Sequence, residues 1–121
     1  MASIRHPTTV YATGIGQANG APTAVTDGIP YLGKAGNTEG MLLVTPNGTT
    51  AGDTITIRPW WWNPEAVNAN KWTKGASTTI TDSGVIEAYL IGTRIYWEVT
   101  AVTIAAGGSW DLGSQFFDKG N

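Results

Sequence analysis

Two glutamates, Glu87 and Glu98, are the carboxylates that the sequence pattern brings closest to each other. They stand in two β-rich runs, residues 85–91 and 94–104, which are joined by a Gly-Thr dipeptide. A two-residue link that begins with Gly is typical of a β-hairpin, and the predicted register places Glu87 directly opposite Glu98. Directly opposed residues have Cβ atoms about 4.5–5.5 Å apart. That separation is close to the carboxylate spacing of about 5–5.5 Å in retaining glycosidases.

Like charges at that distance repel each other, so we expect Arg58, Arg94 or a basic group of another subunit to neutralise the pair. A calcium ion is the alternative, but it takes about six to eight oxygen ligands, far more than two glutamates supply. His6 is the single histidine and the chain has no Cys, which leaves too few side chains for a catalytic triad or a thiolate metal site. We therefore predict no catalytic residue, no metal, no cofactor and no enzymatic activity. The predicted charge cluster comprises Glu87, Glu98, Arg58 and Arg94.

The triple tryptophan at residues 60–62 is the second feature that could bind a ligand or partner. On a strand, Trp61 points to one face and its two neighbours point to the other. Three interpretations stay open: core residues with a covering loop, a protein interface, or a surface on which sugar rings stack. The candidates for an interface or for ligand stacking are Trp60, Trp62, Tyr89, Tyr96 and Trp110.

The predicted hairpin sorts the side chains of residues 85–104 onto two faces. The apolar face is expected in the core and comprises Ile86, Ala88 and Leu90, opposite Val99, Trp97 and Ile95 respectively. The other face carries the glutamate pair and the two tyrosines Tyr89 and Tyr96. Upstream, residues 53–58 alternate, with Ile55 and Ile57 directed inward. Pro59 cannot donate a backbone hydrogen bond, so we expect the strand to end or to reach a sheet edge there.

Seven to nine short strands, punctuated by turn residues, predict an all-β fold, an antiparallel β-sandwich or jelly roll with an extended N-terminal arm. The β-sandwich domain is expected over residues 40–121. Residues 1–39 are rich in Gly, Ala, Thr and Pro, which predicts an extended arm with short strands that buries little apolar surface by itself. We expect this arm to dock on neighbouring protein through Ile4, Val10, Tyr11, Ile29, Tyr31 and Leu32. The alternative is that the arm supplies a strand of its own sandwich.

The composition excludes several classes of function. Charged residues make up 13% of the chain and the formal net charge is −2, whereas nucleic-acid binding requires a basic stripe. No apolar run approaches the roughly 18 residues of a membrane span. The first residues lack the apolar stretch of a secretory signal, so we expect synthesis in a cytoplasm. The low charge suggests that much of the surface meets other protein.

An initiator Met, a Gly/Ala/Thr/Pro-rich arm, few charges, no Cys and a β domain closed by aromatic residues resemble small structural proteins of tailed-bacteriophage virions. Head decoration (cement) proteins and fibre or tail components belong to this class. The resemblance implies a virion location and non-enzymatic self-assembly as a homotrimer or other homo-oligomer. It also implies attachment to major capsid or other virion proteins. The alternative function is a carbohydrate-binding module or receptor-binding head that uses exposed tryptophans.

Overall fold

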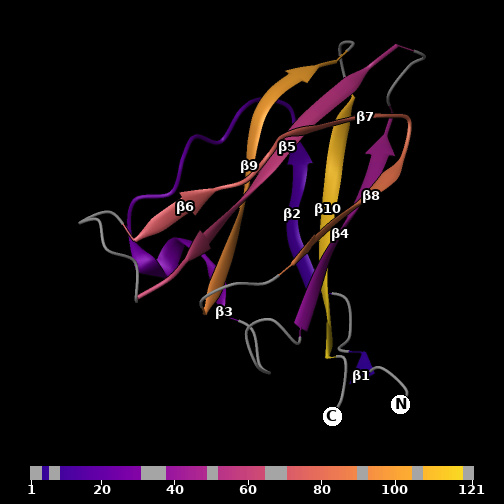
Figure 1. Ribbon diagram of the computed structural model, residues 1–121. Helices are drawn as coiled ribbons and strands as arrows, with labels where there is room; N and C mark the ends of the chain where they lie inside the picture. The colour runs from indigo at the N-terminus through magenta and orange to yellow at the C-terminus, as the bar shows by residue number, and fades with distance from the viewer. Residues whose placement is uncertain are drawn as a thin grey trace.

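The computed structural model describes residues 4–5, 9–30, 38–48, 52–64, 71–89, 93–104 and 108–118. Within them the chain forms two antiparallel sheets packed against each other (Figure 1). Sheet A comprises β1 (Ile4–Arg5), β2 (Thr9–Ile15), β4 (Thr38–Asn47), β8 (Gly84–Tyr89) and β10 (Ser109–Asp118). Sheet B comprises β3 (Ile29–Pro30), β5 (Thr54–Trp62), β6 (Trp72–Lys74), β7 (Thr78–Thr81) and β9 (Arg94–Thr103). The prediction of an all-β antiparallel sandwich is confirmed.

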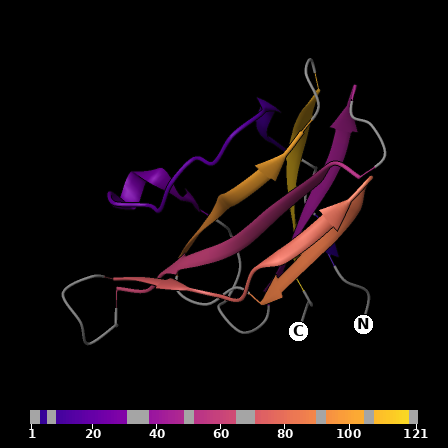
Figure 2. The ribbon, with the colours of Figure 1, turned by 90° about the horizontal axis from the view of Figure 1, so that it is seen from above.

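Each sheet is built around two long strands. In sheet A, β10 pairs with β4 on one side and with β1 and β2 on the other, while β8 lies beyond β4. In sheet B, β5 pairs with β9 on one side and with β6 and β7 on the other, while β3 pairs with β9. The view from above shows the segment between β2 and β3, with its short 3-10 helix (Val25–Asp27), on the β9 side of the sandwich (Figure 2).

Alternating apolar residues of the long strands fill the space between the sheets. In β5, Ile55 and Ile57 are fully buried and Thr54, Thr56 and Arg58 are not, as predicted from the alternation. Trp97 and Trp110 are the largest fully buried side chains. Burial of a large apolar side chain stabilises a fold by about 1.5–3 kcal/mol, so this layer dominates the stability of the sandwich. The buried cluster comprises Leu42, Val44, Ile55, Ile57, Ile86, Ile95, Trp97, Val99, Trp110 and Leu112.

The predicted hairpin over residues 85–104 is wrong, because its two halves belong to different sheets. In β8, Ile86 is paired with Leu42 of β4, whereas in β9, Val99 is paired with Ile57 of β5. Gly92, the first residue of the expected turn, lies outside the described residues, as do Leu90 and Ile91 before it. Most of the predicted core residues are nevertheless buried. An apolar face can be covered by a second sheet about 10 Å away as well as by a neighbouring strand, so the pattern identifies the inward face but not the partner.

Strand β5 continues through Pro59 to Trp62, so of the two predicted alternatives the strand end is wrong, whereas a local sheet edge at Pro59 agrees with the pairing, since neither β6 nor β7 pairs with this residue. The backbone N–H of Gly75 donates to the Pro59 carbonyl oxygen at 2.7 Å. The backbone nitrogen and carbonyl of one strand residue point to the same side of the strand. The N–H that Pro59 lacks would therefore point to the residues between β6 and β7 and not to β9. Neither of those strands pairs with Pro59. The ladder with β9, in which Pro59 is opposite Trp97, is therefore preserved.

The N-terminal segment takes part in both sheets. Ile15 of β2 is paired with Trp110 of β10, and Ile29 of β3 is paired with Ile95 of β9. Tyr11 and Ile29 pack against the core of their own chain, as in the alternative that this segment supplies strands of its own sandwich, and docking of the segment on a neighbour stays a prediction. The side chains of Ile4 and Val10, and all of Tyr31 and Leu32, lie outside the described residues. The proposed domain boundary between residues 39 and 40 remains a prediction; in the structure it falls within β4.

Candidate functional site on the outer face of sheet B

Most of the predicted site residues gather on the outer face of sheet B. Alternate residues of a strand share a face, and in β5 the inward set includes Ile57, so Arg58, Trp60 and Trp62 are directed outward. Their partners on β9 lie on the same face. The three facing pairs are Arg58 with Glu98, Trp60 with Tyr96, and Trp62 with Arg94.

Glu98 is the centre of this face. It is 8% exposed, and its Oε1 accepts hydrogen bonds from Arg58 Nε at 3.0 Å and from Trp60 Nε1 at 2.7 Å. The guanidinium neutralises the carboxylate, while the indole N–H fixes the orientation of the Trp60 ring. We call Arg58, Trp60, Tyr96 and Glu98 the Glu98 cluster.

The predicted pairing of Glu87 with Glu98 is wrong. Glu87 belongs to β8 in sheet A, where it is exposed and paired with Met41. The two carboxylates therefore belong to different sheets and do not form the arrangement that would resemble a glycosidase. Arg94 is also separate from the Glu98 carboxylate, since its Nη1 donates to the Gly28 carbonyl oxygen at 3.1 Å.

A second aromatic cluster lies beside the Glu98 cluster and is covered by the segment between β2 and β3. Trp72 of β6 is only 3% exposed and packs edge to face against Trp62, with ring centroids 5.4 Å apart. Its Nε1 donates to the Ala24 carbonyl oxygen at 3.3 Å. The Tyr96 hydroxyl donates to the Gly20 carbonyl oxygen at 2.9 Å. At this end of the face, Trp72 lies under the covering segment and the half-buried Trp62 packs against it, while the three interpretations of the triple tryptophan stay open.

Strand β2 and the covering segment after it are held to the edge of β9 by the side chains of Tyr11 and Asn19, which bond the backbone there as a neighbouring strand would. The Tyr11 hydroxyl accepts from the Trp97 N–H at 3.1 Å and donates to the Trp97 carbonyl at 3.2 Å. Asn19 accepts from the Val99 N–H at 2.8 Å through Oδ1, and its Nδ2 donates to the Trp97 carbonyl at 3.2 Å. The Asn19 backbone N–H also donates to the Val99 carbonyl at 3.2 Å. Sequence reasoning missed these roles because a Tyr and an Asn in a Gly-rich segment carry no local signal for a distant strand edge.

The titratable groups of this region are shifted in directions that keep the hydrogen bonds intact near neutral pH. Burial raises the pKa of Tyr96, and the nearby Asp27 and Glu98 carboxylates add to the rise. Burial also raises the pKa of Tyr11, so both phenols remain protonated donors. Backbone hydrogen bonds from Thr23 and Ala24 hold the pKa of Asp27 below its usual value. Asp27 therefore stays ionised and closes the turn that covers Trp72.

Two predicted aromatic candidates lie elsewhere. Trp110 is fully buried in the main core, so its ring is not available for stacking on a ligand or partner. Tyr89 belongs by its backbone to β8 of sheet A, opposite Glu39, and its side chain lies outside the described set. The candidate site on the outer face of sheet B therefore comprises Trp60, Trp62 and Tyr96, together with the Arg58–Glu98 pair.

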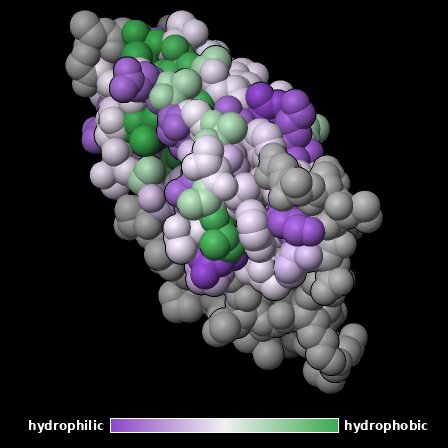
Figure 3. All heavy atoms as spheres, turned by 90° about the vertical axis from the view of Figure 1, so that its left-hand side faces the viewer, coloured by the Kyte–Doolittle hydropathy of each residue, from purple (hydrophilic) through white to green (hydrophobic). Residues whose placement is uncertain are grey.

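The surface on the side of the segment between β2 and β3 is mixed in character (Figure 3). Seen from the side on which the segment between β2 and β3 runs, green hydrophobic groups are separated by pale and purple ones (Figure 3). Among the described residues, no group of three His, Cys, Asp or Glu side chains could hold a metal ion. The described part of the chain also contains no helix that is long and apolar enough to cross a membrane.

Comparison with known proteins identifies no relative of this chain. No protein-family model, no curated protein and no solved structure matches this chain. Any functional assignment therefore depends on the chemistry of the faces and edges of the sandwich.

Proposed function

We propose that this protein is a non-enzymatic structural component of a virion, which self-associates and decorates or cements the surface of a phage capsid or tail. The observation that carries the proposal is the Glu98 cluster. Tryptophan, tyrosine and arginine are the residue types that dominate protein–protein interfaces. Here they lie together on a rigid sheet, with their one carboxylate already neutralised.

The arrangement of charge supports a binding role over catalysis. A general acid or nucleophile needs a carboxylate that can exchange protons or attack a substrate. Glu98 Oε1 is engaged by two donors, and Glu87 lies on the other sheet. The charge-poor composition and the Gly-rich N-terminal segment, which resemble those of phage structural proteins, provide the argument for a virion location.

Solution mass provides the first test of self-association. Light scattering of the purified chain is expected to give a multiple of 12.7 kDa. Trp60→Ala is expected to lower that mass, because truncation of an aromatic anchor removes contact area at the centre of an interface. Thr45→Ala, an exposed site on the opposite sheet, is the matched control. A wild-type chain that remains a monomer would refute self-association, and its absence from purified particles of the parent virus would refute the virion location.

Carbohydrate binding is the second candidate for the same face. The observation that favours it is the Trp60 ring, whose N–H is turned toward Glu98, beside an Arg58 side chain that is 29% exposed. A fixed aromatic ring next to a charged hydrogen-bond donor suits stacking of a sugar ring. A glycan array with Trp60→Ala and Trp60→Phe tests this candidate. Binding that is lost with alanine and retained with phenylalanine would support stacking, whereas no binding by the wild type would exclude it.

A further inference from the structure

The free edge of β8 is the strongest further candidate for a binding site. Among the described strands, β8 pairs with β4 alone, so its other edge presents backbone N–H and C=O groups without strand partners. Natural proteins protect such edges with Lys, Pro or bulges, because an exposed edge pairs readily with another chain. Between Gly84 and Tyr89, the one charged residue of β8 is Glu87.

Apolar side chains lie on both sides of this edge. On the outer face, Val85 is 46% exposed and is the one large hydrophobic side chain in the described residues that is classed as exposed. It is paired with Leu43 of β4, so the apolar surface continues into sheet A.

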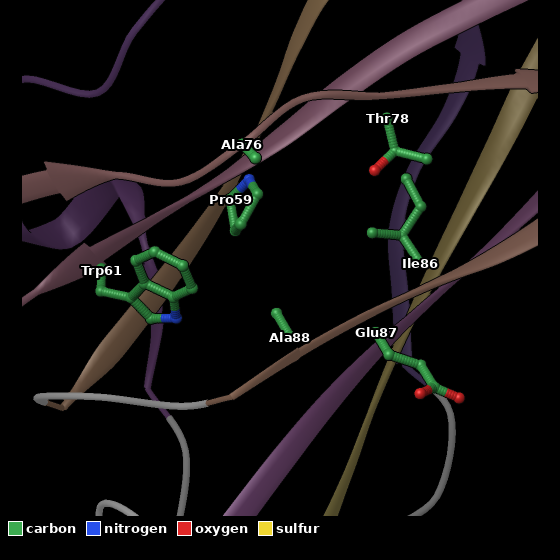
Figure 4. A pocket seen from close by; sticks show the side chains of 7 residues that line it. All are labelled: Pro59, Trp61, Ala76, Thr78, Ile86, Glu87 and Ala88. Carbon is green, nitrogen blue, oxygen red and sulfur yellow. The ribbon is translucent and has the colours of Figure 1, made fainter.

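On the inner side, a cleft of about 300 Å³ opens between the sheets (Figure 4). Trp61 of β5 lines it opposite Ile86 and Ala88 of β8, while the Glu87 carboxylate points away. The Trp61 indole Nε1 is buried and has no hydrogen-bond partner in the described structure.

We propose that a second copy of this chain adds its own β8 to this edge, so that the two β8 strands pair antiparallel about a two-fold axis. This inference rests on the self-association proposed above and names one contact through which it occurs. A two-fold contact uses the same surface of both subunits, and β8 is complementary to itself. With Ile86 opposite Ile86 of the second copy, the large inward residues meet at the centre, and the small Gly84 and Ala88 meet on either side.

Charge and strand length select this register over its neighbours. In a continuous sheet, the inward residues of both β8 strands lie on the same side. The two-fold axis must therefore pass through a directly opposed pair of identical residues, so the alternatives are contacts centred on Val85, Ile86 or Glu87. Centring the contact on Glu87 places two carboxylates directly opposite each other, which is destabilising. Centring it on Val85 limits the overlap to residues 84–86, because the chain turns at Asp82, where φ is +66°. The register centred on Ile86 pairs residues 84–88 and covers Val85 with the stem of Glu87.

Disulfide cross-linking tests the contact and its register together. The chain has no native Cys, so Val85→Cys and Glu87→Cys each introduce a single thiol at an exposed position. In the proposed register, Val85 is opposite Glu87 of the second copy, at the distance of about 4.5–5.5 Å between Cα atoms that a disulfide bridges. Identical positions lie diagonally, about 7–8 Å apart, which is beyond disulfide reach.

An equimolar mixture of the two variants, one with a size tag, is refolded together and oxidised with glutathione disulfide. We expect mixed disulfide dimers in about tenfold excess over those of either variant alone. Mixing Val85→Cys with Thr45→Cys, which lies on β4 of the same sheet, is the control and should give only background. Cross-linking of Val85→Cys alone, or of Glu87→Cys alone, would overturn the register.

Light scattering of the wild-type chain separates this inference from the proposed function. An oligomer whose variants form no mixed disulfide would refute the β8 contact while leaving self-association intact. A monomeric wild type would refute both. Mixed disulfides in a self-associating chain would support both.

Discussion

The hydroxyl of Tyr11 offers the sharpest test of how the N-terminal segment is tied to the sandwich. Tyr11→Phe removes one oxygen and leaves the ring, which packs against the core. The hydroxyl both accepts from the Trp97 N–H and donates to the Trp97 carbonyl. That carbonyl keeps its second hydrogen bond from Asn19 Nδ2. The substitution therefore deprives one partly buried N–H of its partner.

The expected loss of stability follows from these contacts. A buried donor without a partner costs about 1–3 kcal/mol, and the second bond of the hydroxyl adds about 0.5–1.5 kcal/mol. The mutant does not pay the desolvation cost of burying a hydroxyl, and this gain offsets part of the loss. We expect the free energy of unfolding to fall by about 2 kcal/mol. Tyr96→Phe is the matched control, since its hydroxyl makes one exposed bond to the Gly20 carbonyl, which water can replace. Its expected loss is below about 1 kcal/mol.

Urea denaturation followed by tryptophan fluorescence measures both losses under identical conditions. An unchanged slope of the free energy against urea would show that the two variants unfold the same surface as the wild type. Equal losses for Tyr11→Phe and Tyr96→Phe, or a loss below about 0.5 kcal/mol for Tyr11→Phe, would refute the conclusion that the Tyr11 hydroxyl stabilises the fold by bonding the backbone edge of β9.

Three further predictions concern the core, the covering loop and alkaline pH. Trp97→Ala should lower the free energy of unfolding by about 3–5 kcal/mol, because Trp97 is fully buried; a loss below about 1 kcal/mol in urea would contradict its position. Gly28→Ala would place a Cβ 2.5 Å from Trp72 Cη2, so we expect a loss of about 1–3 kcal/mol. In the same thermal-unfolding series, Gly16→Ala, whose Cβ meets nothing within 4 Å, should be neutral. Raised pKa values at Tyr11 and Tyr96 mean that above the ordinary pKa of 10.0 the unfolded phenols ionise while the folded ones keep their protons. The contribution of these two phenols to the free energy of unfolding should therefore be fully present below pH 10 and be lost as the pH rises beyond it. Ionisation of all four tyrosines near pH 10, measured by tyrosinate absorbance, would contradict this prediction.

Local pattern was sufficient to predict the class of fold and much of the core. Alternation in β5 identified Ile55 and Ile57 as inward, and alternation in residues 94–104 identified Ile95, Trp97 and Val99. These inferences succeeded because the two-residue period of a strand is a property of the backbone itself. The same period placed Trp60 and Trp62 on the face opposite Trp61.

Which strands pair with each other was decided only by the tertiary structure. A two-residue link between β-rich runs favoured a hairpin, yet β8 and β9 pair with β4 and β5 in separate sheets. Glu98 consequently meets Arg58 and Trp60 rather than Glu87. The charged neighbours of a carboxylate depend on strand pairing, which is a long-range property that local alternation does not encode.

The sequence by itself determined that this chain forms β-strands with one apolar face, because side-chain alternation and turn residues act over a few neighbouring positions. Only the tertiary structure decided which strands share a sheet and which edges are closed. Tyr11 and Asn19 reach the edge of β9 from more than 70 positions away, while among the described strands one edge of β8 stays open. Both results follow from the packing of distant segments, in which a hydrogen-bond donor is satisfied by whichever acceptor the whole fold places beside it.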